Sequence, residues 1–516
     1  LKWQKEFNDH FISLTTFGAP QEHDQRKYAT DIAMYSKDIA ANLGVDTTGL
    51  EGDYGFNFNP HWGEYNEYDV IFENGVAVDT IFGEDKVGIK YKNYYHKPNF
   101  NLHHLWQIND STSLTNVIYY SNGNGGGTTW QGGDWRNAIT EDNQIDFQAI
   151  YDSNSGNAIH PLLGDASINP LYSETEHLSR NILVSGINKH SWWGMINTFN
   201  HRINSEFDFA GGFDIRTYKG VHYREVYDLL GGDYFLGSNQ AGKNYIGAHS
   251  DNMMLREGDK LFYHNDGLVR WLGGFGQIEY DHKNISAFLN LTGSHSFYKR
   301  IDYFKKKDLV LEDTILVQAV GINDTICYYG NQVNTTCTNP NHNHYTSNSP
   351  EARFTETDWQ RFPGFSAKTG ANWNIDEHHN VFFNTGIISK APRFNNVFDY
   401  DNNLMLYAKN EIIKSIEIGY GYRTSIFALN CNIYRTSWLN KPKSFSVALE
   451  ADVIGTSNIT GLASLYKGIE LDFAWKISDA FKYEFISSIM SNKHTGADTM
   501  FVYVDQQLVY QLSFDP

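Results

Sequence analysis

The chain has 516 residues and a formal net charge of −19, from 60 acidic and 41 basic side chains. This acidic balance argues against a nucleic-acid partner. No run of 18 apolar residues occurs, which excludes a transmembrane helix. Aromatic residues make up 15% of the chain, and Tyr and Trp favour the boundary between membrane and water. A membrane-spanning β-barrel fits this composition, because only alternate residues of its strands need to be apolar.

Nothing in the sequence marks a boundary between domains. Proline is scarce, at 11 residues, and there is no low-complexity segment or block of like charge. We therefore treat residues 1–516 as one domain. The chain opens at Leu1 without a signal peptide and stops at Pro516 inside a strand-like segment. We expect it to be an excised piece of a longer protein.

Taken in chain order, strand-like segments come in pairs joined by tight turns. The turns are predicted at residues 6–9, 109–111, 204–205, 281–284, 376–379, 424–425 and 477–480. The connections between pairs are long, from about 20 to about 70 residues, and three of them begin near residues 19, 122 and 221. The first and longest is rich in Gly and Asn and is predicted to be irregular.

The segment from Asn410 to Asn440 shows the pattern of a pair most clearly. Apolar residues fall on even positions from Ile416 to Tyr422 and, after the turn, on odd positions from Phe427 to Ile433. A period of two indicates strands with one apolar and one polar face.

Two features favour a barrel over a soluble sandwich. Short turns alternate with long connections, as in outer-membrane barrels, whereas sandwiches mix loop lengths at both ends. Charged side chains also lie mid-strand on the polar face, among them Glu206, Asp208, Glu470 and Asp472. Burying them unpaired would cost several kcal/mol each. We predict an all-β fold, a large antiparallel transmembrane β-barrel with a wet or plugged interior, of which about 14 strands are visible in the sequence.

Several segments resemble the barrel domain of TonB-dependent outer-membrane receptors of the Bacteroidota type. They are FGAPQ (17–21), YYHKP (94–98), KGVHYREVYDLLGGDYF (219–235), ISKAPRFNNVFD (388–399), NEIIKSIEIGYGYR (410–423) and NITGLASLYKGIELDF (458–473). The resemblance implies a barrel of about 22 strands that holds an N-terminal plug. The sequence shows no TonB box, no plug and no terminal strand ending in an aromatic residue, so the domain we expect is an incomplete barrel without its plug and C-terminal strands.

The same resemblance implies a function, a location and partners. It implies uptake of a scarce, large ligand across the outer membrane, energised through TonB, with no cofactor. The ligand class stays open among siderophore-iron, haem, cobalamin and oligosaccharide. Expected partners are TonB, the lipid and lipopolysaccharide of the outer membrane, a small-molecule or glycan ligand, and a surface lipoprotein.

Three residues are candidates for ligand binding. Trp130 and Trp135 lie in NGNGGGTTWQGGDW, predicted to be an extracellular loop, where indoles can stack on a sugar, a haem or a siderophore. Packing of these aromatics is the favoured alternative. Arg393 follows a strand end and either contacts an anionic ligand or anchors a loop by pairing, and anchoring is favoured.

The cysteines allow one disulfide and, less readily, a metal site. Cys327 and Cys337 share a polar segment and can pair in an oxidising compartment. His342 and His344 follow Cys337, but the spacing matches no established zinc or copper site. A loop disulfide with solvated histidines is favoured. Cys431 lies on an apolar strand face as a small apolar residue.

Two other functions remain as alternatives. A passive porin would have no plug and an inward-folded loop. A soluble β-rich surface enzyme or glycan-binding protein would have a defined catalytic carboxylate pair. The pairs Glu206 with Asp208 and Glu470 with Asp472 have a suitable spacing. Similar polar positions recur on nearly every strand, however, as a wetted wall predicts, so we expect no catalytic residues.

Overall fold

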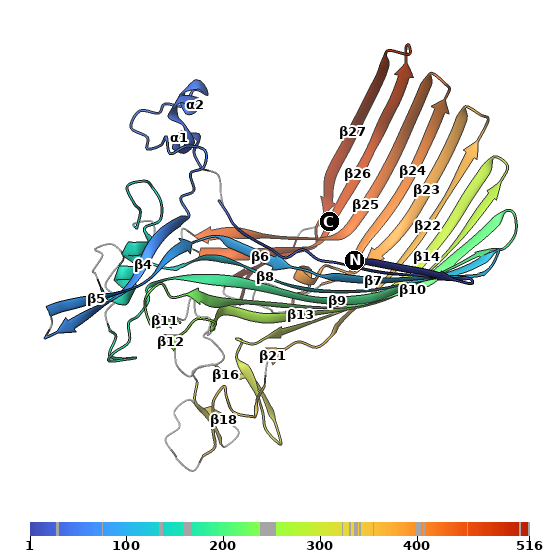
Figure 1. Cartoon of the computed structure of the whole chain (residues 1–516). Coiled ribbons are helices and arrows are strands. Elements are labelled where there is room, and N and C mark those ends of the chain that lie inside the picture. Colours follow the sequence, from blue (N-terminus) through green and yellow to red (C-terminus); the bar gives the residue numbers. More distant parts are fainter. Residues whose placement is uncertain are drawn as a thin grey trace.

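The computed structural model describes residues 1–516 apart from 27–29, 75, 134–137, 158–162, 164–167, 238–253, 322–323, 330–331, 335–338, 340–341, 354, 399–403, 406–407, 451–452, 505–506 and 514–516. Antiparallel strands make up most of the described chain (Figure 1). Its helices are short: α1 (Ile32–Tyr35), α2 (Lys37–Asn42), α3 (Phe147–Ser155) and the 3-10 helix η3 (Phe394–Asn396). None of the helices in these residues is long and apolar enough to cross a membrane.

The main sheet has 19 strands, and most of them form a single meander in which each strand pairs antiparallel with the next. The strands of the meander are β1 (Lys2–Phe7), β2 (His10–Phe17), β7 (Asn99–Asn109), β8 (Thr112–Gly132), β9 (Asn181–Arg202), β10 (Phe207–Asp228), β13 (Lys260–His282), β14 (Ile285–Asp302), β22 (Gln360–Asn374), β23 (His379–Lys390), β24 (Glu411–Arg423), β25 (Phe427–Glu450), β26 (Val453–Lys476) and β27 (Lys482–Gly496). The prediction of a large antiparallel sheet of barrel type is confirmed.

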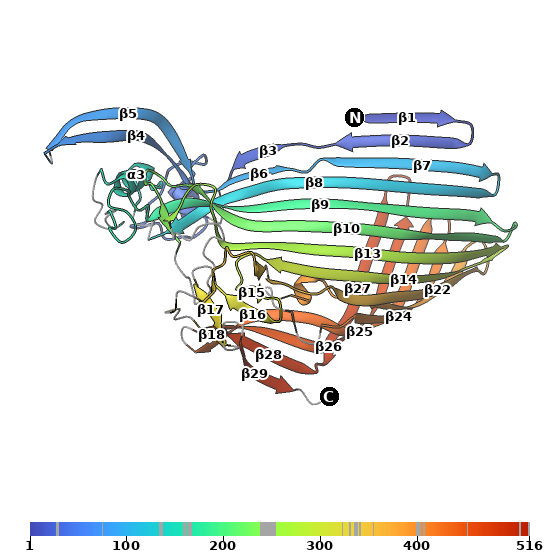
Figure 2. The same cartoon turned by 90° about the horizontal axis from the view of Figure 1, so that it is seen from below.

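Shorter strands gather at the end of the meander that carries the long connections, which we call the loop end (Figure 2). Five of them extend the main sheet: β3 (Gln21–Asp24), β6 (Lys92–His96), β21 (Thr355–Glu356), β28 (Thr499–Val504) and β29 (Gln507–Ser513). The others form small separate sheets: β4 (Trp62–Glu73) with β5 (Val76–Ile89), β11 (Phe235–Leu236) with β12 (Met254–Leu255), β15 (Lys307–Val310) with β16 (Ile315–Val320) and β20 (Ala352–Arg353), and β17 (Ile326–Tyr329) with β18 (Gln332–Asn334) and β19 (His344–Tyr345).

The opposite end of the sheet, which we call the turn end, carries the tight turns. Each predicted turn joins two neighbouring strands of the meander there, so the turn predictions are confirmed. In the turn between β24 and β25, the Thr424 N–H donates to the Phe427 carbonyl oxygen at 2.7 Å, and Thr424 Oγ1 accepts from the N–H of Phe427 at 3.0 Å. A threonine hydroxyl therefore replaces water on the backbone of this turn.

The meander is strongly curved, and β22 to β27 stand steeply against β7 to β13 in Figure 1. Side chains on the concave face of a curved sheet converge, and those on the convex face spread apart. On β22, Phe365 is 49% exposed while Ser366 is 9% exposed. The same alternation separates Leu291 from Ser296 on β14, at 51% and 2%. We call the less exposed face the inner face and the other the outer face.

The sheet register keeps apolar side chains together on the outer face. Directly opposed residues of an antiparallel pair point to the same side. Ile418 opposes Ile433, Tyr420 opposes Cys431, and Cys431 in turn opposes Leu471. The apolar faces predicted for these three strands therefore form one continuous surface.

The strands extend further than the sequence predicted. β8 runs through the Gly-rich segment to Gly132, and β10 continues past Val221 to Asp228. A Cβ at Gly125 would lie 2.6 Å from the Tyr94 carbonyl oxygen. The glycines therefore admit the close approach of β6, and the interpretation of this run as a flexible loop is wrong.

The first long connection was predicted to be irregular, and this is also wrong. It contains α1, α2 and the β4–β5 hairpin, against which α3 packs. Phe147 of α3 is fully buried over the paired residues Gly63 and Gly88 of that hairpin. A Cβ at Gly88 would lie 2.2 Å from the phenyl ring, so the absence of side chains makes room for it. The α3 and β4–β5 elements, which we call the loop module, thus pack around a small core at the loop end, to which β8 and β9 also contribute.

Candidate functional site

The inner face of β8, β9, β10 and β13 gathers aromatic, histidine and arginine side chains toward the loop end. We call this group the inner-face cluster; its members are Tyr119, His190, Trp192, Arg216, Tyr218, His222 and Trp271. The sheet register brings them together from segments more than 150 residues apart in the sequence.

Arg216 lies at the centre of the portion of the inner-face cluster that is nearest the turn end. Its Nε donates to Asp214 Oδ1 at 2.8 Å, and its guanidinium carbon lies 5.7 Å from the centroid of the Trp271 ring. On its other side the register places Gly194 and then Tyr119. A Cβ at Gly194 would lie 2.3 Å from the Tyr119 hydroxyl, so this glycine lets the phenol lie across the wall beside Arg216.

His190 and Tyr218 are the next members of the inner-face cluster toward the loop end. The two side chains are joined by a hydrogen bond of 2.5 Å between His190 Nδ1 and the Tyr218 hydroxyl. The Trp192 ring meets the Tyr218 ring edge-on at 5.6 Å. Gly220 sits between these groups, and a Cβ there would lie 2.5 Å from the Tyr218 hydroxyl. Here again a glycine provides the space that the aromatic side chain occupies.

His222 completes the cluster. Its Nδ1 lies 2.6 Å from Asn188 Oδ1, and its ring meets the His190 ring edge-on at 5.6 Å. Both histidines lie on the loop side of Lys219, where the outer face is no longer apolar. Burial lowers the pKa of His222, and the nearby His190 and Arg300 lower it further. Burial, followed by the charge of Lys97, also lowers the pKa of His190. Both rings are therefore neutral at pH 7.

Neutral imidazoles, phenols, indoles and a guanidinium paired with Asp214 make a surface that binds by stacking and hydrogen bonding. Such a surface suits a large organic ligand with hydroxyl or aromatic groups. Among the described residues, no three His, Cys, Asp or Glu side chains come together as ligands of one metal ion.

Arg393 lies on a connection that folds over the inner face. The Tyr298 hydroxyl donates to the Pro392 carbonyl oxygen at 2.9 Å, and Val397 and Phe398 are buried against Tyr298. These contacts hold the connection in place, while the Arg393 side chain is exposed and forms no ion pair within the described part of the chain. Apolar packing therefore does the anchoring that was predicted for Arg393, and a role in contacting an anionic ligand stays a prediction.

Trp130 does not lie in a loop as predicted. It belongs to β8, is 9% exposed, and packs with Tyr65, Phe147 and Leu183 in the core of the loop module. The sequence could not show this, because the packing partners come from distant segments. Trp135 falls outside the described residues, so its predicted contact with ligand stays a prediction.

Of the two cysteines of the predicted disulfide, Cys327 lies among the described residues. Cys327 is fully buried in β17 and lies opposite His344 of β19, whereas Cys337 falls outside the described residues. The Cys327–Cys337 pairing therefore stays a prediction. His342 packs against the Tyr329 ring at 4.1 Å. Cys431 is a free thiol.

The two carboxylates of the first predicted pair, Glu206 and Asp208, contact different partners. Glu206 Oε1 lies 2.7 Å from His282 Nδ1, and Asp208 Oδ1 lies 3.5 Å from Arg202 Nε. Glu206 was predicted to lie within a strand. It belongs instead to the turn before β10, which begins at Phe207. The two carboxylates therefore serve separate contacts at the turn end.

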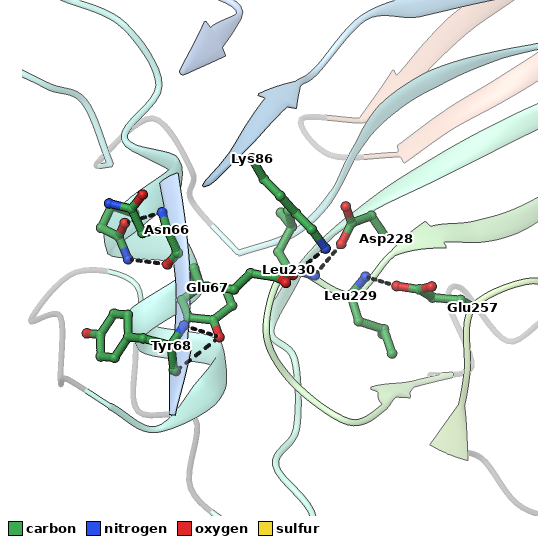
Figure 3. A network of polar contacts seen from close by, with 10 residues as sticks. Asn66, Glu67, Tyr68, Lys86, Asp228, Leu229, Leu230 and Glu257 are labelled. Carbon is green, nitrogen blue, oxygen red and sulfur yellow. Dashed lines mark hydrogen bonds and ion pairs between the residues drawn. The ribbon is translucent and has the colours of Figure 1, made fainter. Parts of the chain in front are cut away.

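The loop module meets the end of β10 through a polar network (Figure 3). Lys86 of β5 forms an ion pair with Glu67 of β4. Asp228 Oδ1 accepts from the Leu230 N–H at 2.7 Å, and Glu257 Oε1 accepts from the Leu229 N–H at 3.1 Å. Burial raises the pKa of the Asp228 carboxyl, Glu257 and Glu67 raise it further, and the Leu230 hydrogen bond and Lys86 oppose the rise.

Removing the charge of Asp228 is expected to stabilise the loop module. The pKa of Asp228 is higher in the folded than in the unfolded protein, so protonation of Asp228 stabilises the folded state. This stabilisation is fully present below the ordinary pKa of 3.8 and is lost as the pH rises through the folded pKa. Asp228→Asn keeps the oxygen that accepts from Leu230 and should slow hydrogen exchange in residues 62–89 at pH 7. At pH 3.5, variant and wild type should exchange alike after correction for intrinsic rates. Faster exchange in the variant at pH 7 would contradict the argument.

The structure thus defines a curved antiparallel sheet with an apolar outer face and a polar, aromatic inner face, in the manner of a large barrel wall. No protein-family model matches the sequence. No curated protein matches it either.

Several solved structures resemble the chain. The copper transporter OprC has 10% identity and a TM-score of 0.48, with 96% of this chain and 60% of that chain covered. The ferric-catecholate import receptor Fiu from E. coli K12 has 11% identity and a TM-score of 0.44, with 97% and 60% covered. The ferric citrate transporter FecA has 7% identity and a TM-score of 0.46, with 96% and 52% covered. The chain spans at most 60% of the length of these proteins.

Proposed function

We propose that the chain forms part of the wall and the ligand-binding surface of an outer-membrane active transporter that takes up a scarce, large ligand. The observation that carries the proposal is a pattern repeated on the outer face. Each of several strands begins with an aromatic residue at the turn end, continues with apolar residues, and reaches a cation toward the loop end.

Three neighbouring strands show this pattern. The outer face runs from Tyr422 to Lys414 on β24, from Phe427 to Arg435 on β25, and from Trp475 to Lys467 on β26. Phe427 opposes Trp475 and Arg435 opposes Lys467. The aromatic border and the cationic border of the apolar band therefore both continue from β25 to β26. Eight residues correspond to about 27 Å of strand. At the tilt of barrel strands, about 35–45°, this length spans about 20 Å, close to the apolar band of a membrane barrel, which is about 25 Å tall and bordered by aromatic girdles.

Polar side chains within this outer band bond to one another. His10 Nδ1 lies 3.0 Å from His104 Nε2, and the Asn116 amide donates to His104 Nδ1 at 3.3 Å. The Asn197 amide in turn donates to Asn116 Oδ1 at 2.7 Å. Paired polar groups of this kind are tolerable in lipid, because their hydrogen bonds do not depend on water.

Active uptake, in preference to passive diffusion, is supported by the inner face. The inner-face cluster and the exposed Arg393 offer stacking and hydrogen-bonding groups that would hold a ligand, whereas a porin needs only a wet channel. The resemblance to TonB-dependent receptors supports energy coupling through TonB and a location in the outer membrane. Siderophore-iron, haem, cobalamin and oligosaccharide remain the ligand classes, and a surface lipoprotein remains a proposed partner.

The test uses the full-length protein in its own outer membrane. We expect its mobility in SDS gels to change on boiling, because a closed barrel stays compact until heated. Cells should take up one of four probes, a ferric siderophore, haem, cobalamin or a maltooligosaccharide, and a protonophore should abolish that uptake. Uptake that persists with the protonophore would favour a porin. A soluble protein without a heat-dependent shift would favour the surface enzyme.

A further inference from the structure

A row of cations marks the limit of the apolar band on the outer face. We call it the outer cation row; its members are Arg270, Arg361, Lys414, Arg435 and Lys467. All five are exposed, and within the described residues none of them forms an ion pair. Lys219 and Lys299, just beyond the row, do form ion pairs, with Asp266 at 2.8 Å and Glu356 at 3.0 Å.

Unpaired cations on this face contrast with the charge of the whole chain. At a net charge of −19, acidic side chains are plentiful, and yet none of those described forms an ion pair with a member of the row. A line of positive charge beside an apolar surface attracts an anion that is attached to something apolar.

Two arginines of the row share a pocket of about 670 Å³ that is lined by residues of β9, β10, β13, β14 and β22. Phe297 opposes Arg270 on one side and Arg361 on the other. The two arginines therefore stand two strands apart, about 10 Å between their Cα atoms. Both guanidinium groups can reach one phosphate from this spacing, and Arg is the side chain whose paired N–H groups match phosphate oxygens.

Aromatic rings hold these guanidinium groups in place. The guanidinium carbon of Arg270 lies 4.4 Å from the centroid of the Trp359 ring, and that of Arg361 lies 5.9 Å from the Phe297 ring. Stacking occupies the flat face of a guanidinium and leaves its N–H edge free to donate. The pocket therefore presents oriented donors and not merely positive charge.

The rest of the pocket is apolar and faces the band. Trp193 is 47% exposed and Leu272 is 52% exposed, and Ile215 lies directly opposite Leu272. An acyl chain can lie along Ile215 and Leu272 while a phosphate meets the arginines. An indole such as Trp193 suits the boundary between the two.

We propose that this pocket binds the phosphate-bearing headgroup of a membrane glycolipid, with the acyl chains against the apolar band. The lipid is of the lipopolysaccharide kind, which carries phosphates on a sugar headgroup. The inference rests on the proposed function, because it needs the outer face to lie in a membrane. It adds a site on the outer face of the wall, next to the inner-face cluster, since Arg216 and Trp271 of that cluster also line the pocket.

The test compares variants of the full-length protein extracted from outer membranes in detergent. Binding of lipid A, of enzymatically dephosphorylated lipid A and of inorganic phosphate is measured by native mass spectrometry. The variants are Arg270→Gln, Arg361→Gln and the double variant. Arg423→Gln is the matched control, because Arg423 is an exposed arginine at the turn end of β24 without an ion pair among the described residues.

We expect lipid A to bind the double variant about tenfold more weakly than the wild type, since two charge-assisted contacts are lost. Dephosphorylated lipid A should bind the wild type more weakly than lipid A does, by a similar factor. The Arg423→Gln variant should bind lipid A as tightly as the wild type. Equal binding of both lipids by a protein that shows the heat-dependent gel shift would overturn the site and leave the proposed function standing. Binding of inorganic phosphate as tight as that of lipid A would also overturn the lipid as its ligand. Absence of the gel shift would overturn the proposed function itself.

Discussion

Leu471→Arg is expected to remove most of the folded protein from the outer membrane. Leu471 lies on the outer face of β26, midway between Trp475 and Lys467, and opposes Cys431 of β25. An arginine at the middle of the apolar band of a membrane barrel costs about 2–4 kcal/mol. A loss of this size is comparable to a large part of a protein's net stability. The measurement is the amount of heat-modifiable protein in outer-membrane extracts of cells that express the full-length variant.

Glu470→Arg on the same strand is the matched control. Glu470 points to the inner face beside Asn432 and is exposed, so a charged side chain there stays in contact with water. This variant should insert at close to the wild-type level. If both variants insert equally well, the two faces of β26 do not differ in environment, and the outer face is not in lipid. A loss in both variants would mean that the arginine disturbs the strand itself.

The sequence predicts the strands of the wall well because their environment repeats every second residue. From Ile416 to Ile433 the apolar positions identify the outer face correctly, and the tight turns fix which strands pair. Strand ends at the loop end were predicted less well. Past Gly123 on β8 and Val221 on β10 the outer face is no longer suited to contact with lipid. The alternation of apolar and polar residues therefore fades, although the backbone pairing continues.

The inner-face cluster was missed for a different reason. Tyr119, Gly194, Arg216 and Trp271 stand side by side only because of the register of four strands. None of these residues belongs to a local motif. A usable signal was present, since Gly194 and Gly220 occupy inner-face positions, Gly194 next to Tyr119 of β8 and Gly220 next to Tyr218 of its own strand. Recognising it requires the register, which a single sequence does not provide.

Phe147→Ala is expected to unfold the loop module while the barrel wall stays intact. Phe147 is fully buried, and its ring lies 6.3 Å from the Tyr65 ring and against the Gly63–Gly88 pair. Truncating a buried phenylalanine costs about 3–5 kcal/mol. The neighbouring glycines have no side chains that could fill the space, so the cavity should remain open. Hydrogen exchange in residues 62–89 and 147–155 should rise strongly, and the heat-dependent gel shift should not change.

Leu171→Ala serves as the control, because Leu171 is also at the loop end but is 87% exposed. It should leave exchange in the module unchanged. The contrast separates two sources of order in this chain. Strand pairing and the apolar outer face hold the wall together, whereas the module depends on the core that Phe147 and Tyr65 form with Trp130 of β8. If Phe147→Ala also abolished the gel shift, wall and module would fold as one unit. The long connections would then be part of what stabilises the curved sheet, and not only a surface for ligand.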